Sequence, residues 1–184
     1  MKTVISFRRV LAVVAMTGVL IAPIVSAQKL NGLWFKLKLA GKGEVVDVNT
    51  SNIVQKATFN IPVFAQFSNT VANTYTIRYW TQVDGVWTNS NLDTPSNIIA
   101  IGTNNTFLSD VGATFTGSGS NSVHVFHTIF IGTKLDSTGV VKSATYSGAG
   151  EIIMGTIVDS GVTNFFFGGC TINGATIDPS KFPF

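Results

Sequence analysis

The sequence predicts an all-β protein, a single antiparallel domain of about eight strands, with an up-and-down barrel favoured over a two-sheet sandwich. Three observations support this prediction. After residue 30, apolar residues recur at every second position, which is typical of strands with one buried face. Runs rich in Gly, Asp, Asn and Ser separate these segments at short intervals. Turns this short join antiparallel neighbours, because parallel strands need crossovers of a dozen or more residues.

In the first half of the chain, the expected strands alternate clearly between apolar and polar positions. Segments 33–39 and 59–67 each carry apolar residues at every second position. Pro62 has no N–H group to donate to a ladder, so the second segment is expected to be an edge strand or to contain a bulge. Short strands are expected near 98–101 and 106–115, and the Gly- and Ser-rich run 116–122 is expected to be a flexible loop.

The dipeptide Asp84-Gly85 is the strongest hairpin signal in the chain, because it suits the positive backbone φ angles of a type I′ turn. A turn of two residues pairs Val83 with Val86 and Gln82 with Trp87. Alternation along the strands then places one set of polar and aromatic side chains on a shared face. This candidate ligand-binding face consists of Arg78, Trp80, Gln82 and Trp87. Exposed aromatic, amide and guanidinium groups together can stack on a sugar ring or anchor a protein partner.

From residue 123 onward, the expected strands follow one another as a meander. They are 123–133, 140–147, 151–158 and 162–168. The separating turns are Asp136-Ser137-Thr138-Gly139, Gly148-Ala149-Gly150 and Asp159-Ser160-Gly161. Several of these segments are apolar at both alternating positions, so we expect both sides of them to be covered.

The N-terminus has the three parts of a secretory signal peptide. They are a basic start with Lys2, Arg8 and Arg9, the apolar stretch 10–24, and the small residues of Val25-Ser26-Ala27. Residues 1–27 are expected to be cleaved after Ala27, which leaves one domain, 28–184. The mature protein is therefore predicted to be exported to the periplasm or the extracellular space, with no membrane span. A retained anchor is the alternative, but Gly18 and Pro23 interrupt the apolar run.

Charge and cysteine content exclude several classes of function. Three of the twelve basic residues leave with the signal peptide, so nine basic residues face nine acidic ones. A formally neutral chain does not suit nucleic-acid binding, which needs clustered surplus Lys and Arg. Cys170 is the single cysteine, so no internal disulfide forms, and its apolar neighbours predict a buried, unreactive thiol.

No motif predicts a catalytic residue, a metal site or a cofactor. A Gly-x-Ser-x-Gly nucleophile elbow, a His-Glu-x-x-His zinc motif and a phosphate-binding loop are all lacking. His124 and His127 are three positions apart on an expected strand, so they should point to opposite faces rather than share a metal ion. An enzyme using these histidines or Glu151 is therefore the weaker alternative.

Gly32-Leu33-Trp34, early in the first expected strand, resembles the G-x-W element of the lipocalin and avidin-like calycin barrels. The resemblance covers three residues. It favours a calycin-like barrel over a sandwich.

These observations predict an exported, non-enzymatic binding protein of unknown specificity, with a small apolar molecule inside the barrel or a glycan on the aromatic face as candidate ligands. The first alternative is a structural or adhesive cell-surface or extracellular protein that self-associates, because charged residues make up only 11% of the chain. The second is a small outer-membrane β-barrel, which the terminal Phe184 favours. Pro179 and Pro183 oppose it, since each removes a ladder donor.

Overall fold

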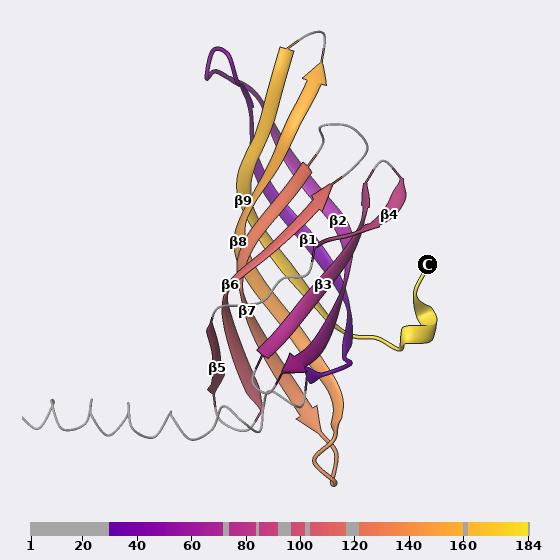
Figure 1. Ribbon diagram of the computed structural model, residues 1–184. Helices are drawn as coiled ribbons and strands as arrows, with labels where there is room; N and C mark the ends of the chain where they lie inside the picture. Colours follow the sequence, from indigo (N-terminus) through magenta and orange to yellow (C-terminus); the bar gives the residue numbers. More distant parts are fainter. Residues whose placement is uncertain are drawn as a thin grey trace, which may run out of the picture.

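Figure 1 shows the computed structural model, which describes residues 30–71, 74–83, 85–91, 97–101, 104–116, 122–159 and 162–183. The predicted signal peptide, its cleavage position and Phe184 lie outside these ranges. The strands are β1 (Trp34–Asp47), β2 (Ile53–Val71), β3 (Thr74–Val83), β4 (Val86–Asn89), β5 (Asn97–Ile101), β6 (Asn105–Thr116), β7 (Ser122–Leu135), β8 (Val141–Asp159) and β9 (Val162–Thr176). The predicted all-β, antiparallel fold is confirmed. No helix in the described ranges is long and apolar enough to cross a membrane.

The strands form one sheet in the order β4-β3-β2-β1-β9-β8-β7-β6-β5. From β1, in the middle of the sheet, β2, β3 and β4 follow outward to one edge. Strand β5 then forms the opposite edge, and β6 to β9 return from it until β9 pairs with β1. All neighbouring strands pair antiparallel. The sheet curls strongly around its own inner face (Figure 1), but in the described part of the chain no ladder joins β4 to β5. The prediction that the sheet closes into a barrel is therefore wrong, and the fold is an open, curled sheet.

The two halves of the curled sheet meet along a seam between β3 and β4 on one side and β6 on the other. Asn91, just after β4, bridges this seam with two hydrogen bonds. Its N–H donates to the carbonyl of Thr114 at 3.2 Å, and its side-chain oxygen accepts from the N–H of Thr114 at 3.0 Å. In the described part of the chain, Asn91 thus holds the seam locally through its backbone N–H and its side chain, without a continuous ladder.

Alternate side chains of the strands point into the curl and form one core. These are Phe35, Leu37, Leu39, Val63, Ala65, Phe67, Tyr75, Ile77, Tyr79, Leu108, Val111, Ala113, Phe115, Val125, Ile129, Ile131, Ala144, Tyr146, Ile152, Phe166, Cys170 and Ile172. Leu30, ahead of β1, is fully buried and belongs to the same core. Cys170 is buried as expected, and burial raises the pKa of its thiol.

The turn predicted at Gly148-Ala149-Gly150 is wrong, because β8 runs through it without a break. Gly150 faces inward opposite His127, and a Cβ atom there would meet the carbonyl oxygen of Phe126 and lie 2.6 Å from Cα of His127. Glycine at this position lets β7 and β8 approach closely and bend, which a larger residue would prevent. Gly148 and Gly150 thus allow the sheet to curve and do not form a turn.

Two expectations for the first half of the chain have different outcomes. The β3–β4 hairpin has the predicted register, with Val83 opposite Val86 and Gln82 opposite Trp87. The expectation that the strand containing Pro62 lies at a sheet edge is wrong, because β2 pairs with both β1 and β3. The ladder with β3 begins only at Val63, one residue beyond Pro62, so the missing N–H falls where that ladder has ended.

Candidate functional site

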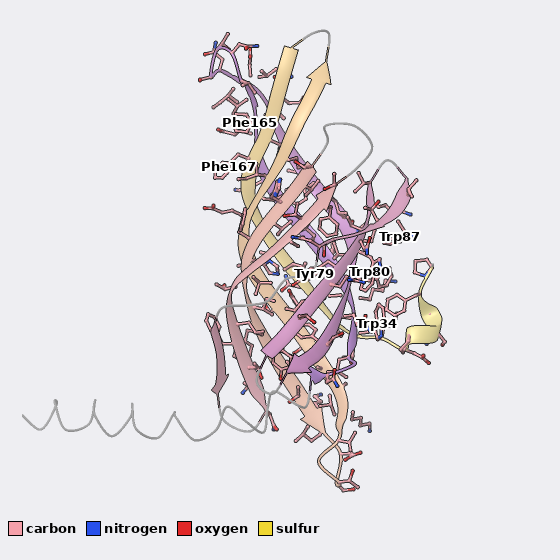
Figure 2. All side chains as sticks on the ribbon, viewed as in Figure 1. Trp34, Tyr79, Trp80, Trp87, Phe165 and Phe167 are labelled. Atoms are coloured by element: carbon pink, nitrogen blue, oxygen red, sulfur yellow. The ribbon has the colours of Figure 1, made fainter. Side chains whose placement is uncertain are left out.

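The predicted binding face forms on the outer side of β3 and β4, where Arg78, Trp80, Gln82 and Trp87 share one face as expected. Aromatic rings of neighbouring strands join it. Trp80 stacks on Trp34 of β1 with ring centroids 4.9 Å apart, and Trp87 lies 5.2 Å from Phe64 of β2. We call Trp34, Phe64, Trp80 and Trp87 the outer aromatic cluster. Figure 2 shows its three tryptophans on the side of the sheet where the C-terminal segment lies.

The C-terminal segment packs against this cluster. Asp178 caps a short 3-10 helix, Pro179–Lys181, by accepting from the N–H of Ser180 at 2.9 Å. Phe182 then lies 4.3 Å from Trp34 and 4.8 Å from Phe64, measured between ring centroids. The C-terminal tail therefore packs on the outer face of the sheet through Phe182. Trp80 and Trp87 are half-buried and Gln82 is exposed, and ligand binding by this face remains a prediction.

A cavity of about 240 Å³ lies inside the curl, at the end that carries the β3–β4 and β6–β7 hairpins (Figure 1). It is lined by Leu39, Ile61, Val63, Thr81, Gln82, Val83, Phe115, Ser122, Val123, Met154 and Gly155. These residues come from both halves of the sheet, so the cavity spans the seam between β3 and β6. Its wall is mainly aliphatic and aromatic. The hydroxyl of buried Thr81 already donates to the carbonyl of Pro62 at 3.0 Å.

Two larger troughs, of about 630 and 650 Å³, lie over β6, β7 and β8 and over β1, β2, β8 and β9. Their linings share Ala149 and Gly150, which are small and offer few groups to hold a ligand. The interior cavity surrounds a ligand on more sides with larger apolar side chains. Enclosure and apolar lining are the usual properties of small-molecule sites, so we take the interior cavity as the candidate site.

A polar cluster lies deeper in the core, built from His127, Tyr79 and Tyr146. Nε2 of His127 is 2.7 Å from the Tyr146 hydroxyl and 3.3 Å from the Tyr79 hydroxyl, and the two hydroxyls are 3.0 Å apart. His127 is only 4% exposed, and Nδ1 has no hydrogen-bond partner among the described residues. Burial lowers the pKa of His127 to about 4, so the ring is neutral at pH 7.

Three comparisons bear on the identity of the chain. No protein-family model, no curated protein and no solved structure matches it. The similarity of Gly32-Leu33-Trp34 to the calycin element therefore stands on those residues alone. In this fold Trp34 lies in the outer aromatic cluster rather than in the core.

Sequence reasoning located some of these features and missed others. His124 and His127 lie on opposite faces of β7, as predicted from their odd spacing: His127 is buried inside and His124 is half-buried outside. The residues that line the cavity were not predicted. They come from six strands, and local sequence does not show how these strands pair. The tyrosine partners of His127 were missed for the same reason, since Tyr79 and Tyr146 are far from it in sequence.

Proposed function

We propose that the protein is an exported binding protein that holds a small apolar molecule in the interior cavity. The cavity at the seam is the observation that supports this proposal. Below it, the interior is filled by large side chains such as Phe35, Phe67 and Tyr146, whose rings pack against one another. Among the described residues, the cavity therefore lies at one end of a core that these rings fill elsewhere, which is a suitable place for a ligand.

The size and the lining of the cavity define the class of ligand. An apolar cavity of about 150 Å³ is large enough to bind benzene, so a cavity of about 240 Å³ suits a somewhat larger ring or a short aliphatic chain. Leu39, Val63, Phe115 and Met154 offer no charge to such a ligand. A charged or strongly polar molecule would lose its hydration without compensation. The expected ligand is therefore uncharged and mainly hydrocarbon.

Fluorobenzene is a suitable first probe, with binding followed by ¹⁹F NMR. The mature protein is expected to bind it with a dissociation constant of about 1 mM, which is typical of so few ligand atoms. Val123→Phe, which places a ring in the cavity wall, should weaken binding at least tenfold. Val140→Phe adds the same ring at an exposed turn and should leave binding unchanged. Equal binding by both variants would refute the proposed site.

A structural or adhesive role through self-association is the second candidate. The outer face of β7 and β9 exposes Phe126, Phe130 and Phe167, with fractional exposures of 54%, 42% and 45%. Figure 2 shows Phe165 and Phe167 on the side of the sheet away from the outer aromatic cluster. Exposed phenylalanines grouped in this way are typical of surfaces that contact another molecule.

A further inference from the structure

Three lysines lie in a row on the outer face of β1. Lys36, Lys38 and Lys42 are all exposed, and the first two alternate with Leu37 and Leu39, which point into the core. We call these three lysines the lysine row. At about 3.3 Å per strand residue, Lys36 and Lys38 are about 7 Å apart, and Lys42 follows about 13 Å further along. The row is therefore a line of positive charge along the middle of the sheet.

Little negative charge lies close to the lysine row. Glu44, the next acidic residue on β1, forms an ion pair with Lys56 of β2, with Nζ and Oε1 3.8 Å apart. Glu151 of β8 is separated from Lys42 by Gly169 of β9, which is opposite both of them in the two ladders. In the described part of the chain, no carboxylate forms an ion pair with the row. The outer face of β1 is therefore positive, although basic and acidic residues balance over the predicted mature chain.

Uncharged polar groups flank the lysine row on both sides. Strands β2 and β9 pair with β1 and place two amides and two hydroxyls beside it. These exposed groups belong to Thr58, Asn60, Thr171 and Asn173. Amides and hydroxyls both donate and accept hydrogen bonds, so they suit a ligand that is rich in hydroxyl groups.

The trough of about 650 Å³ lies beside the Lys42 end of the row. Its far side, at Ala149 and Gly150, offers few groups to a ligand, but Lys42, Thr58 and Thr171 line it on the near side. Gly169 also lines the trough, and an added Cβ atom there would meet nothing within 4 Å. The space next to the Lys42 ammonium group is therefore open to a bulky part of a ligand.

The other end of the lysine row meets the outer aromatic cluster. Trp34 precedes Lys36 by two positions on the same face of β1, and Phe64 is directly opposite Lys36 on β2. Trp80 stacks on Trp34. Aromatic rings at such a place can stack on a sugar ring. The three tryptophans of the chain all belong to this cluster, so their fluorescence reports on a ligand bound beside Lys36.

We propose that the lysine row binds an acidic polysaccharide that lies along β1. Its carboxylate groups contact the three ammonium groups, and its hydroxyl groups contact the flanking amides and hydroxyls. Charge complementarity supports an anionic partner. The polar flanks favour a polysaccharide over a lipid surface, which binds apolar side chains inserted beside the basic ones. Nucleic acid binding would need more basic residues in one cluster. The site is separate from the interior cavity, which lies on the other face of the sheet.

The test measures binding of an alginate hexasaccharide by isothermal titration calorimetry and by tryptophan fluorescence. Raising NaCl from about 0.05 M to about 0.5 M should weaken binding, because salt screens exposed charges. Uncharged maltohexaose should not bind. Lys38→Gln/Lys42→Gln should lower the affinity at least about tenfold, through the loss of two charge-assisted hydrogen bonds. Lys134→Gln/Lys142→Gln removes the same charge from exposed positions of β7 and β8 and should bind like the wild type.

Gly169→Phe tests the place of the ligand without a change of charge. Its ring would fill the trough beside Lys42 and should also weaken binding, whereas Gly169→Ala should not. Circular dichroism checks that each variant is folded. No binding by the wild type, equal affinities of the two double variants, or unchanged affinity of Gly169→Phe would overturn the proposal. Tighter binding of a single-stranded oligothymidylate or of phosphatidylglycerol vesicles than of alginate would overturn the assignment to a polysaccharide.

Discussion

Acidification from pH 7 to pH 4 is expected to lower the free energy of unfolding by about 3 kcal/mol through His127 alone. The pKa of His127 falls from 6.5 to about 4 on burial, because the charged imidazole would lose its hydration inside the core. Between these two values the unfolded chain takes up a proton that the folded chain does not. The contribution of neutral His127 to the free energy of unfolding is therefore complete above pH 6.5. It is lost as the pH falls toward 4, at about 1.36 kcal/mol per pH unit.

Urea unfolding at pH 7 and pH 4, followed by tryptophan fluorescence, measures this effect. His127→Phe should remove most of the difference between the two pH values, since phenylalanine does not titrate. His124→Gln should retain it, because His124 lies outside the core. Hydrogen bonds lower the pKa values of Asp47, Asp136 and Asp178 from 3.8, so these groups lose their contribution mainly below pH 4, and His127→Phe keeps all three of them. The same pH dependence in the wild type and in His127→Phe would contradict the assignment.

Gly150→Ala is expected to cost about 3 kcal/mol of stability or to prevent folding. The added methyl group would meet the carbonyl oxygen of Phe126 and lie 2.6 Å from Cα of His127. Both are backbone atoms, which cannot rotate away as a flexible side chain can, so β7 and β8 would have to separate. A loss of this size is at the upper end of what overpacking causes.

Gly169→Ala is the matched control for this prediction. Gly169 lies on β9 with an ordinary strand backbone, and a Cβ atom there would meet nothing within 4 Å. The change should alter stability by no more than about 0.5 kcal/mol. Thermal unfolding of both variants, followed by circular dichroism, compares them directly. If Gly150→Ala is as stable as Gly169→Ala, the inward glycines of β8 do not set the curvature of the sheet.

The contrast between Asp84-Gly85 and Gly148-Ala149-Gly150 shows which parts of the fold were predictable. The Asp-Gly pair specifies a turn by its own backbone preference, so the β3–β4 register could be derived from neighbouring residues alone. Gly148 and Gly150 are compatible with two structures: a turn, or inward strand positions where neighbouring strands approach closely. Which of the two forms depends on β7 and β9, which lie on either side of β8 and are not evident from the local sequence.

The candidate sites show the same division. The odd spacing of His124 and His127 along a strand was enough to place them on opposite faces of β7. The contact between the Thr114 hydroxyl and His124 required the cross-strand register, which no local pattern reports. The cavity required the curl of the whole sheet, since its walls belong to strands as distant as β1 and β8.

Native mass spectrometry of the protein, isolated without detergent from its own host, tests whether the interior cavity holds a ligand. We expect a reproducible extra mass from one small uncharged molecule, which Val123→Phe should lack. An extra mass that persists in Val123→Phe would place the ligand outside the cavity. A monomer without added mass in every preparation would contradict ligand binding in the cavity. A series of oligomers without added mass would also contradict it and would favour the structural role.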